Sequence, residues 1–544
     1  MQLYKQFCKE TFNDDNTLKD FEIKFEDNFN FGYDVVDKMA ELAPDDIALV
    51  WANPEGDSKK FTFADISRLS NKAVNVFKKY GIKKGDKVML MLKRNYEYWY
   101  IVTALHKMGA VAIPATNMLT AEDIEYRVNA VEIKAAVCTP DGDASADLLT
   151  VAAKENSLRT VFVARKDVEG AVNITTEIEN ADDKLERIKT KVDEQLLIYF
   201  TSGTTGYPKA VMHNHTYPLC HIVTAKHWQN VQDRGLHLTV AETGWAKASW
   251  GKIYGQWLCG SAVMAYDFDN FSPSKLLQII EKFKVTTFCA PPTVYRYFAK
   301  RGMKKYDLSS LKHISTAGEA LNPSVAETVH KEMGLKIMEG FGQTESTLIL
   351  GNLVGTEPKP GSIGKPTPLY DVRLVDNDGN EVKQGETGEI VIFPPKDKKQ
   401  YGIFNGYIGD EQMYQHAWRG GVYHTRDTAY MDEDGYFWYV GRADDLIKSR
   451  GFRVGPFEIE NVIMKHPAVL ECAVIGVPDE SRGQAIKAFI KLAKGYDAED
   501  KHLANDIKTF CNKNLASYKW IQYVEFTDEM PKTISGKIKR IDLK

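Results

Sequence analysis

A stretch of small and polar residues, FTSGTTGYPKAV (200–211), directly follows the apolar run QLLIYF. Its glycines allow the backbone to approach a ligand closely, and its Ser and Thr hydroxyls can donate hydrogen bonds to phosphate oxygens. Lys209 adds a mobile positive charge that suits a polyphosphate leaving group. The stretch therefore predicts a loop for the β- and γ-phosphates of ATP. Its candidate ligands are Thr201, Ser202, Gly203, Thr204, Thr205, Gly206 and Lys209.

Two other interpretations of this stretch have to be weighed. A cluster of Ser, Thr and Gly after a strand is often only a turn. A Walker P-loop needs the pattern G-x-x-x-x-G-K-[ST]. Here Gly203 and Gly206 are too close together, and Ala210 stands where a hydroxyl should follow the lysine. A Walker ATPase is therefore disfavoured, and a simple turn stays open until the rest of the chain is considered.

The elements around the loop alternate between helix and buried strand. DISRLSNKAVNVFKKYG (65–81) has the apolar spacing of an amphipathic helix, and DKVMLML (86–92) has the pattern of a buried strand. This alternation continues to about residue 340 and predicts a layered α/β domain with largely parallel sheets. In such sheets ligands bind beyond the carboxyl ends of the strands, which is where the loop falls.

The pattern changes after about residue 355. YDVRLVDNDGNEVKQGETGEIVIF (370–393) and DTAYMDEDGYFWYVG (427–441) alternate apolar and polar residues around Asp-Gly turns, which predicts a hairpin-rich β subdomain. Helix and strand patterns of a smaller α+β domain follow to the end of the chain. We therefore predict a large domain over 1–443 and a small mobile C-terminal domain over 444–544, with a hinge near Asp444.

Composition sets limits on the class of protein. The 544 residues carry 70 Lys+Arg against 74 Asp+Glu, so the net charge of -4 gives no general attraction to nucleic acid or to an anionic membrane. No apolar run approaches the length of a spanning helix, and the N-terminus lacks a signal-peptide core. The seven scattered cysteines predict buried, reduced thiols rather than disulfides or a zinc site, and with them a cytoplasmic location.

Further motifs decide how the loop is to be interpreted. GEALNP (318–323), EGFGQTES (339–346), the segment 423–460 and PKTISGKIKR (531–540) follow the loop in that order. Together they resemble the core motifs of the adenylate-forming superfamily, which includes acyl-CoA synthetases, firefly-type luciferases and adenylation domains of peptide synthetases. The resemblance is greatest to medium-chain acyl-CoA synthetases. It implies that a carboxylate attacks ATP to give acyl-AMP and pyrophosphate, and that coenzyme A then displaces AMP to give acyl-CoA.

The resemblance also implies roles for residues of the large domain. Glu345 matches the magnesium ligand of the family, Thr344 a contact to the α-phosphate, and Phe341 a ring that stacks on adenine. An oxygen anion suits a hard cation that bridges phosphates. The implied adenine and phosphate contacts are Gly318, Glu319, Ala320, Glu339, Gly340, Phe341, Gly342, Gln343 and Thr344.

The C-terminal part supplies a second set of implied residues. Asp427 matches the ribose ligand and Arg442 a ribose or phosphate contact, and rotation at Asp444 is expected to exchange the faces of the small domain. Lys537 is expected to bridge the carboxylate and the α-phosphate in the first half-reaction, where Lys209 also acts on phosphate. Arg453 matches a phosphate contact, and the implied coenzyme A contacts are Arg450, Gly451, Phe452 and Arg482.

The acid is predicted from the expected acyl pocket. Acetate-specific relatives carry a tryptophan where this chain has Gly342, so the floor is expected to be open and acetate a poor substrate. Trp245, Lys247 and Trp250 are expected wall residues, although a tryptophan in the core is an equally good interpretation of Trp250. The prediction is a short-to-medium or branched aliphatic acid, with an aryl acid such as benzoate as the alternative.

Two further alternatives concern the reaction itself. A ligase could stop at the adenylate, and a catalytically inactive chain could serve as a nucleotide sensor. The GFRVG segment (451–455) favours free coenzyme A as the acceptor, and the motif residues needed for catalysis are present. We therefore expect an enzyme that uses ATP, magnesium and coenzyme A, takes a small acid, binds neither nucleic acid nor membrane, and is a monomer or homodimer.

Overall fold

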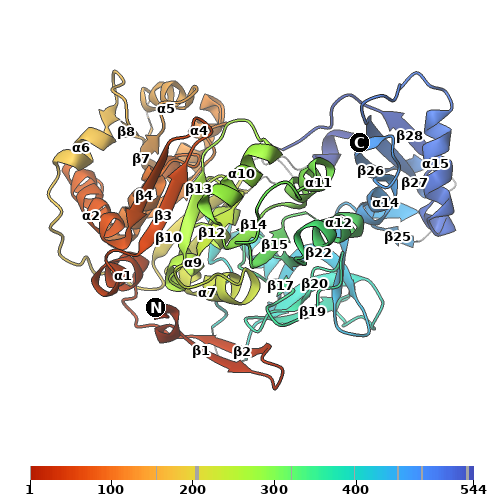
Figure 1. Ribbon diagram of the computed structural model, residues 1–544, viewed down its shortest axis with the longest axis horizontal. Coiled ribbons are helices and arrows are strands. Elements are labelled where there is room, and N and C mark those ends of the chain that lie inside the picture. Colours follow the sequence, from red (N-terminus) through yellow and green to blue (C-terminus); the bar gives the residue numbers. More distant parts are fainter. Residues whose placement is uncertain are drawn as a thin grey trace. The chain divides into compact units, whose positions relative to one another are not determined.

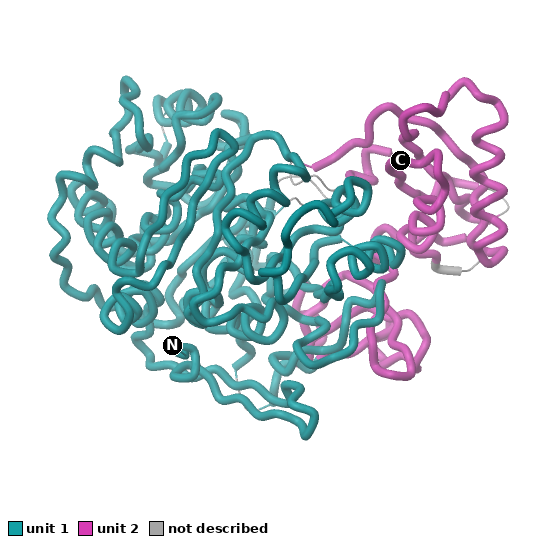
Figure 2. The backbone as a smooth tube through the Cα atoms, in the orientation of Figure 1, with its two compact units in different colours: residues 1–371, 394–416 teal, residues 372–393, 417–544 magenta. Residues whose placement is uncertain are grey.

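The computed structural model describes residues 2–154, 156–201, 208–319, 321–396, 399–449, 452–479, 482–533 and 538–543, with only the backbone described at 452 and 453. The predicted residues 202–206, 320, 450, 451 and 537 lie outside these ranges. The chain forms two compact units (Figure 2). Unit 1 holds residues 1–371 and 394–416, and unit 2 holds residues 372–393 and 417–544.

The first sheet of unit 1 has eight strands in the order β21-β11-β10-β6-β5-β7-β8-β9. Of these, β7, β8 and β10 are labelled in Figure 1. Its central ladders are parallel, whereas β11 and β21 continue the edge in antiparallel pairing. In chain order the strands are β5 (Lys87–Met91), β6 (Val111–Pro114), β7 (Ile133–Cys138), β8 (Thr160–Val163), β9 (Val172–Asn173), β10 (Gln195–Thr201), β11 (Lys209–Asn214) and β21 (Gly406–Tyr407).

The second sheet of unit 1 has nine strands in the order β18-β17-β16-β15-β14-β12-β13-β3-β4 and is parallel from β16 to β3. In chain order they are β3 (Ile47–Ala52), β4 (Ser58–Thr62), β12 (Leu236–Thr239), β13 (Ala262–Tyr266), β14 (Thr287–Cys289), β15 (His313–Ala317), β16 (Ile337–Phe341), β17 (Leu350–Gly351) and β18 (Lys365–Pro366). Its parallel strands are largely buried on both faces, as expected of a sheet covered by helices on both sides, although they include buried polar residues such as His237, Thr287 and Ser315.

Helices cover these sheets and bury their apolar faces. One core cluster lies where α2 packs against α3, and another joins α10, α11 and α12 to the second sheet. The helices are η1 (Leu3–Gln6), η2 (Gly32–Asp37), α1 (Lys38–Leu42), α2 (Phe63–Lys79), α3 (Glu97–Met108), α4 (Ala121–Val131), α5 (Ala144–Ala152), α6 (Ile174–Asn180), α7 (Tyr217–Ile222), η3 (Val223–Trp228), α8 (Lys247–Gly251), α9 (Tyr254–Leu258), α10 (Pro273–Phe283), α11 (Pro292–Arg301) and α12 (Pro323–Met333). A short hairpin of β1 (Cys8–Phe12) and β2 (Leu18–Ile23) lies between η1 and η2, and α13 (Glu411–Ala417) follows β21.

Unit 2 contains two sheets. The first is antiparallel, with β19 (Asp371–Val375), β20 (Gly388–Phe393), β22 (Tyr423–Met431) and β23 (Phe437–Arg442) in the order β19-β20-β22-β23. The second joins β24 (Ile447–Ser449), β25 (Phe452–Val454), β26 (Val469–Asp479), β27 (Gly483–Leu492) and β28 (Tyr523–Phe526). The other elements are η4 (Arg419–Gly421), α14 (Pro456–Ile463), α15 (Leu503–Lys513), η5 (Ser517–Lys519) and η6 (Arg540–Leu543).

The α/β fold class predicted from the sequence is confirmed in its main parts. The helix predicted over 65–81 is α2, the strand predicted over 86–92 is β5, and the Asp-Gly turn after Met431 joins β22 to β23. The second sheet of unit 2 has a core of its own, built from Ile447 onward. The compact units place the hairpin subdomain with the C-terminal part, so the domain boundary near Asp444 stays a prediction.

Two findings concern the chain as a whole. All seven cysteines are buried and free, as predicted. Among the described residues, none of the helices combines the length and the apolar character that crossing a bilayer requires.

Candidate active site

The described ends of the predicted phosphate loop lie on two antiparallel strands. β10 ends at Thr201 and β11 begins at Lys209, and these two residues face each other in the ladder. Between them, 202–207 lie outside the described residues. The ammonium of Lys209 lies 5.5 Å from the ring centroid of Tyr407 on β21. The fold therefore places the lysine where the predicted loop closes, next to an aromatic ring that the sequence analysis did not identify.

Tyr407 also connects this strand pair to the predicted magnesium ligand. Its hydroxyl donates a hydrogen bond to Oε1 of Glu345 over 2.9 Å. The backbone of Glu345 is fixed as well, since its carbonyl accepts a hydrogen bond from the amide of Phe404 at 2.7 Å. Lys209 and Glu345 therefore share one neighbour, which orients a carboxylate oxygen beside the described end of the loop.

A buried histidine holds the backbone of Thr344. Nε2 of His213 lies 2.8 Å from the carbonyl oxygen of Thr344. Burial lowers the pKa of His213 to about 4, although the bond to Thr344 acts in the opposite direction. The ring is therefore neutral near pH 7, and since a carbonyl can only accept, Nε2 must carry the proton. His213 also stacks on Tyr217 with ring centroids 3.9 Å apart.

Two of the residues predicted for the adenine slot bond to neighbouring segments, Glu339 to two loop amides and Glu319 to the start of α11. The carboxylate of Glu339 accepts hydrogen bonds from the amides of Gly361 (2.8 Å) and Leu321 (3.4 Å). Burial raises its pKa from 4.5 to about 8, against the effect of these two amides. Oε2 of Glu319 accepts a hydrogen bond from Oγ1 of Thr293 at 2.9 Å. Their roles toward a nucleotide stay predictions.

The other described residues of this slot lie on β16 or directly after β15 and β16. Gly340 and Phe341 end β16, Gly318 follows β15, and the amide of Gln343 donates to Oγ of Ser346 at 3.0 Å. The carboxyl ends of two neighbouring parallel strands thus bring together the motifs GEALNP and EGFGQTES. This is the position in which open α/β sheets bind ligands.

The expected floor of the acyl pocket needs a correction. A Cβ on Gly342 would lie 2.5 Å from Cη2 of Trp250 and 2.5 Å from the carbonyl oxygen of Thr347. The space that the small Gly342 leaves is thus filled by an indole, so the floor is not open at this position. Trp250 is only 6% exposed and packs edge-on against Trp228, with ring centroids 6.1 Å apart.

Further aromatic residues surround this contact. His221 lies 6.3 Å from Trp250 between ring centroids and 4.5 Å from Tyr217. Burial lowers the pKa of His221 well below its usual value, so this ring is uncharged. We call Tyr217, His221, Trp228, Trp250 and Gly342 the aromatic cluster. Of the other predicted wall residues, Lys247 donates to the carbonyl of Ala317 at 2.7 Å and Trp245 is half-buried.

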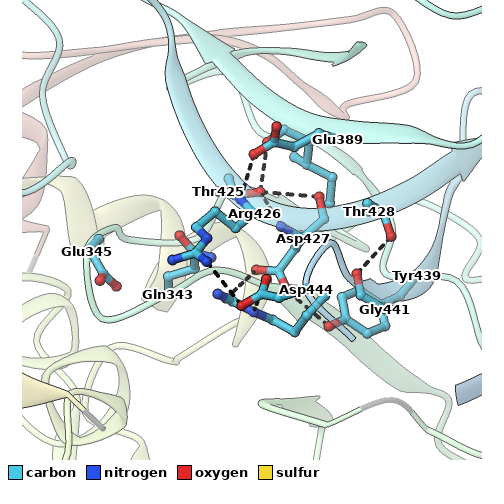
Figure 3. A network of polar contacts seen from close by, with 12 residues as sticks. Gln343, Glu345, Glu389, Thr425, Arg426, Asp427, Thr428, Tyr439, Gly441 and Asp444 are labelled. Carbon is cyan, nitrogen blue, oxygen red and sulfur yellow. Dashed lines mark hydrogen bonds and ion pairs between the residues drawn. The ribbon is translucent and has the colours of Figure 1, made fainter. Parts of the chain in front are cut away.

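Unit 2 carries a network of charged residues around Asp427 (Figure 3). Oδ1 of Asp427 accepts a hydrogen bond from the hydroxyl of Tyr439 at 3.0 Å, and Oδ2 lies 3.6 Å from Nη1 of Arg442. Asp427 and Arg442 face each other on β22 and β23. The predicted ribose ligand and its predicted neighbour therefore lie together within one unit.

The predicted hinge residue belongs to the same network. Oδ2 of Asp444 lies 3.1 Å from Nη2 of Arg426, and Oδ1 lies 3.9 Å from Nε of Arg442. We call Arg426, Asp427, Arg442 and Asp444 the linker network. The backbone φ of Arg426 is 62°, a value that residues other than glycine rarely adopt. The amide of Arg426 donates a hydrogen bond to Oε1 of Glu389 at 2.9 Å. Sequence reasoning did not identify Arg426.

Three of the predicted coenzyme A and phosphate residues are described in part. In the backbone ladder, Phe452 pairs with Ser449 and Arg453 with Lys448. The amide of Arg482 donates to the carbonyl of Asp479 at 3.4 Å. The predicted Ser202, Gly203, Thr204, Thr205, Gly206, Ala320, Arg450, Gly451 and Lys537 lie outside the described residues.

Comparison with known proteins gives a consistent result. The model of the AMP-binding enzyme family matches residues 36–408, and that of the AMP-binding enzyme C-terminal domain matches residues 458–537. The chain is 38% identical over 544 residues to the mitochondrial acyl-coenzyme A synthetase ACSM3 of Pongo abelii, covering 98% of this chain and 92% of the relative. It is also 38% identical over 501 residues to 4-hydroxybutyrate–CoA ligase 1 of Metallosphaera sedula, covering 91% of this chain and 86% of that one.

A solved structure agrees with these relatives. The anthranilate CoA ligase AuaEII in complex with anthranoyl-AMP superposes with a TM-score of 0.87 at 27% identity, covering 95% of this chain and 97% of that chain. The comparisons also correct one prediction. The cytoplasmic location expected from the sequence is wrong, because the ACSM3 and ACSM4 relatives are named as mitochondrial enzymes.

Proposed function

The chain belongs to the AMP-binding enzyme family and is an AMP-forming acid–coenzyme A ligase, and from this premise we propose that its acid is a short-to-medium or branched aliphatic acid. The enzyme makes an acyl-AMP from the acid and ATP, releases pyrophosphate, and transfers the acyl group to coenzyme A with release of AMP. The observation that supports the choice of acid is the indole of Trp250, which lies against Gly342.

The chemistry of the first half-reaction favours fixed cations and hydrogen-bond donors. Attack of a carboxylate on the α-phosphate brings two anions together, so groups that neutralise charge and hold the geometry supply most of the catalysis. We propose that Lys209 acts on the leaving pyrophosphate, Thr344 on the α-phosphate, and Lys537 on both the carboxylate and the α-phosphate. Thr201 and the rest of the loop would bind the remaining phosphate oxygens.

The donor set fits a magnesium ion held mainly by substrate. Magnesium prefers hard oxygen ligands and is commonly bound by one or two carboxylates together with substrate phosphates. Glu345 supplies such a carboxylate, with one oxygen oriented by Tyr407. Among the described residues there is no group of three or more His, Cys, Asp or Glu side chains that could form an all-protein site. When bound, the ion would neutralise the charge that develops on the phosphates.

Asp427 and Arg442 are proposed to bind the ribose. A short carboxylate suits a vicinal diol, and the side chain of Asp427 is already oriented by Tyr439 and Arg442. The second half-reaction is proposed to follow a rotation of the backbone at Asp444. That rotation would exchange Lys537 for the segment 450–453, and we propose that the small size of Gly451 would let the pantetheine arm pass.

The aromatic cluster limits the length of the acid. Because Trp250 occupies the space next to Gly342, we propose that an acyl chain cannot extend in this direction, which favours short or branched acids over long straight ones. One methylene changes selectivity by only about 10–200-fold, so we propose a range of acids rather than one compound. This range suits a place in fatty acid metabolism, with the enzyme acting as a monomer or homodimer.

An aryl acid is the second candidate. The similar structure AuaEII is an anthranilate CoA ligase with anthranoyl-AMP bound, and the aromatic cluster could stack on a flat ring as well as border an alkyl chain. A panel of acetate, butyrate, 2-methylbutyrate, octanoate and benzoate separates the two candidates. The proposal expects acid-dependent pyrophosphate release to be greatest with butyrate or 2-methylbutyrate, whereas a maximum with benzoate would support the aryl alternative.

Two further measurements test the reaction itself. Each acid is assayed with and without coenzyme A, and pyrophosphate release without thioester formation would point to a ligase that stops at the adenylate.

Lys537→Ala should abolish acyl-AMP formation but largely spare thioester formation from supplied acyl-AMP. Lys539→Ala, two residues further along the same tail, serves as the matched control. An equal loss of both half-reactions in Lys537→Ala would refute the proposed role.

A further inference from the structure

The described residues on both sides of 534–537 make backbone and side-chain contacts with the rest of unit 2. Lys532 pairs with Ile538 in an isolated backbone bridge, and the amide of Lys539 donates to the carbonyl of Pro531 at 2.8 Å. Nζ of Lys532 lies 2.8 Å from Oε1 of Glu471. Ile538 packs against an apolar cluster on the sheet of β26 and β27. The described parts of the C-terminal tail, 531–533 and 538–543, are therefore held against the small domain by backbone and side-chain contacts.

Among the described residues of this tail, Arg540 contacts two carboxylates, those of Glu460 and Asp445. Its Nη2 lies 2.7 Å from Oε1 and 2.9 Å from Oε2 of Glu460 on α14. Glu460 is only 8% exposed, and its Oε1 also accepts a hydrogen bond from the amide of Val474 at 2.8 Å. Burial alone would lower the pKa of Arg540, but Glu460 and Asp445 raise it above its usual value, so the guanidinium stays charged.

The other terminal nitrogen of the Arg540 guanidinium, Nη1, contacts the segment that follows β23, which we call the linker. Nη1 of Arg540 lies 3.5 Å from Oδ2 of Asp445, which directly follows the predicted hinge residue Asp444. The amide of Asp445 donates to the carbonyl of Arg442 at 3.0 Å, so this carboxylate has a fixed position relative to β23. A planar guanidinium can hold two carboxylates at once, which an ammonium group cannot do with the same geometry. Arg540 thus ties together the tail, α14 and the linker.

We propose that Arg540 is a positioning residue of the first half-reaction, which fastens the tail that carries Lys537 to both α14 and Asp445. This inference rests on the proposed function of Lys537. In sequence Arg540 follows Lys537 by three residues. Because an error of 1 Å in the placement of a reacting group can cost about 100-fold in rate, a fastening so close to the lysine has a catalytic consequence. The contact to Asp445 makes the position of the tail depend on the conformation of the linker.

A pure role in stability would have different consequences. A buried ion pair that only supports the small domain would, when weakened, lower both half-reactions through loss of folded protein. A positioning role predicts that the half-reaction that needs Lys537 is affected and the other is spared. The two half-reactions therefore separate the explanations, provided that folding is measured on the same samples.

Arg540→Lys is the central variant, because it keeps the charge and loses the planar fork. We expect acid-dependent acyl-AMP formation to fall about 10- to 100-fold, while thioester formation from supplied acyl-AMP and coenzyme A changes less than about 3-fold. Lys539→Ala is the matched control, because Lys539 lies next to Arg540, its side chain forms an ion pair with the exposed Asp542 at 2.9 Å, and its backbone bond to Pro531 is kept in the variant. It should leave both half-reactions within about 2-fold of the parent enzyme.

If Arg540→Lys is poorly folded, Asp445→Asn tests the positioning role of Arg540 instead. It leaves the pair of Arg540 and Glu460 in place and removes only the charge on the linker, so it should slow acyl-AMP formation about 3- to 10-fold and spare thioester formation. Equal loss of both half-reactions, or no change in either, in folded Arg540→Lys and Asp445→Asn would overturn the inference. Failure of the unmodified enzyme to form acyl-AMP from any acid would instead overturn the proposed function.

Discussion

The aromatic cluster of unit 1 and the linker network of unit 2 are held by different forces. Around Trp250 the side chains are buried, and the two histidines, His213 and His221, are kept neutral by burial. In the linker network, by contrast, the side chains of Arg426 and Asp444 are 39% and 29% exposed, and their contact is an ion pair. The aromatic cluster depends on close packing. The linker network depends on charged contacts, of which the pair of Arg426 and Asp444 is partly exposed to water, whereas Asp427 is buried.

The difference indicates a division of tasks. A packed interior resists small changes of volume, because each side chain fills the space left by its neighbours. Exposed ion pairs contribute little and can be exchanged for water or for other partners at small cost. Fixed packing is what the proposed acyl-pocket role of the aromatic cluster requires, whereas exchangeable contacts fit the proposed hinge at Asp444. Substitutions in the two regions should therefore have effects of different kinds.

The largest effect is expected at Trp250. Trp250→Ala removes a buried indole, and such changes typically lower the free energy of unfolding by about 3–5 kcal/mol. The opened space should shift selectivity from butyrate toward octanoate by about 10–200-fold in kcat/KM. Chemical denaturation and kinetics across the acid panel measure both quantities. An unchanged preference would show that Trp250 does not border the acid.

Gly342 provides a direct test of this contact. Gly342→Ala should destabilise the parent protein by about 1–3 kcal/mol, because the added Cβ would overlap Trp250 and the carbonyl of Thr347. The same change should cost less when Trp250 is already alanine, since one of the two overlaps is then gone. A double-mutant cycle on the free energy of unfolding measures this coupling, and strict additivity would contradict the proposed packing.

An intermediate effect is expected at Asp427, in the linker network. Asp427→Asn keeps the shape of the side chain but removes its charge, and hydrogen bonds to charged groups contribute about 1.5–3 kcal/mol. The KM for ATP should rise about 10- to 100-fold, with little change in acid preference. Asp432→Asn, in the turn of the same hairpin, is the matched control. A change in acid preference in Asp427→Asn would contradict the division between the two regions.

A smaller effect concerns Glu339, which is buried near the aromatic cluster. Its pKa of about 8 in the folded protein lies above the value of 4.5 for an exposed glutamate, so the folded state binds the proton more tightly than the unfolded state. The stabilisation is complete below pH 4.5 and is lost as the pH rises through 8. The free energy of unfolding should fall between these values with a slope of at most about 1.4 kcal/mol per pH unit.

Glu339→Gln tests this assignment, because an amide does not titrate. Urea denaturation between pH 5 and pH 8 should show a clearly flatter pH dependence in this variant than in the parent protein. Glu357→Gln, at an exposed ion pair with Lys336, should leave the slope as it is. An identical slope in Glu339→Gln and in the parent protein would show that Glu339 is already ionised at neutral pH.

The smallest effect is expected at Arg426. Its contact with Asp444 joins two partly exposed side chains, and such pairs contribute about 0.2–1 kcal/mol. Arg426→Ala should therefore lower the free energy of unfolding by no more than about 1 kcal/mol. It should nevertheless alter the ratio of the two half-reaction rates, which single-turnover assays measure. A large loss of stability would show that this contact is not readily exchanged.

The sequence allowed prediction of those features that depend on local patterns. The periodicity of apolar residues located α2 and β5, and Asp-Gly located the turn between β22 and β23. Asp427 and Arg442 were chosen as candidates because each lies within a long motif, and their roles toward the ribose stay predictions. These features share one property, namely that neighbouring residues in the chain determine them.

Features formed by distant segments could not be predicted in this way. Tyr407 contacts Glu345 across 62 positions of the chain, and His213 contacts Thr344 across 131. Trp250 fills the space beside Gly342 only because α8 packs against the residues that follow β16. The open floor expected at Gly342 was wrong for this reason, since the size of one residue does not tell which neighbour occupies the space it leaves.

The division of tasks is tested most directly by rates of both half-reactions, measured across the acid panel for Trp250→Ala and Asp444→Pro. A proline restricts the backbone at the predicted hinge. The account predicts that Trp250→Ala changes the order of preferred acids and keeps the ratio of the two half-reaction rates, whereas Asp444→Pro changes that ratio and keeps the order. Asp444→Pro that slows both half-reactions equally, or that reorders the acids, would contradict it.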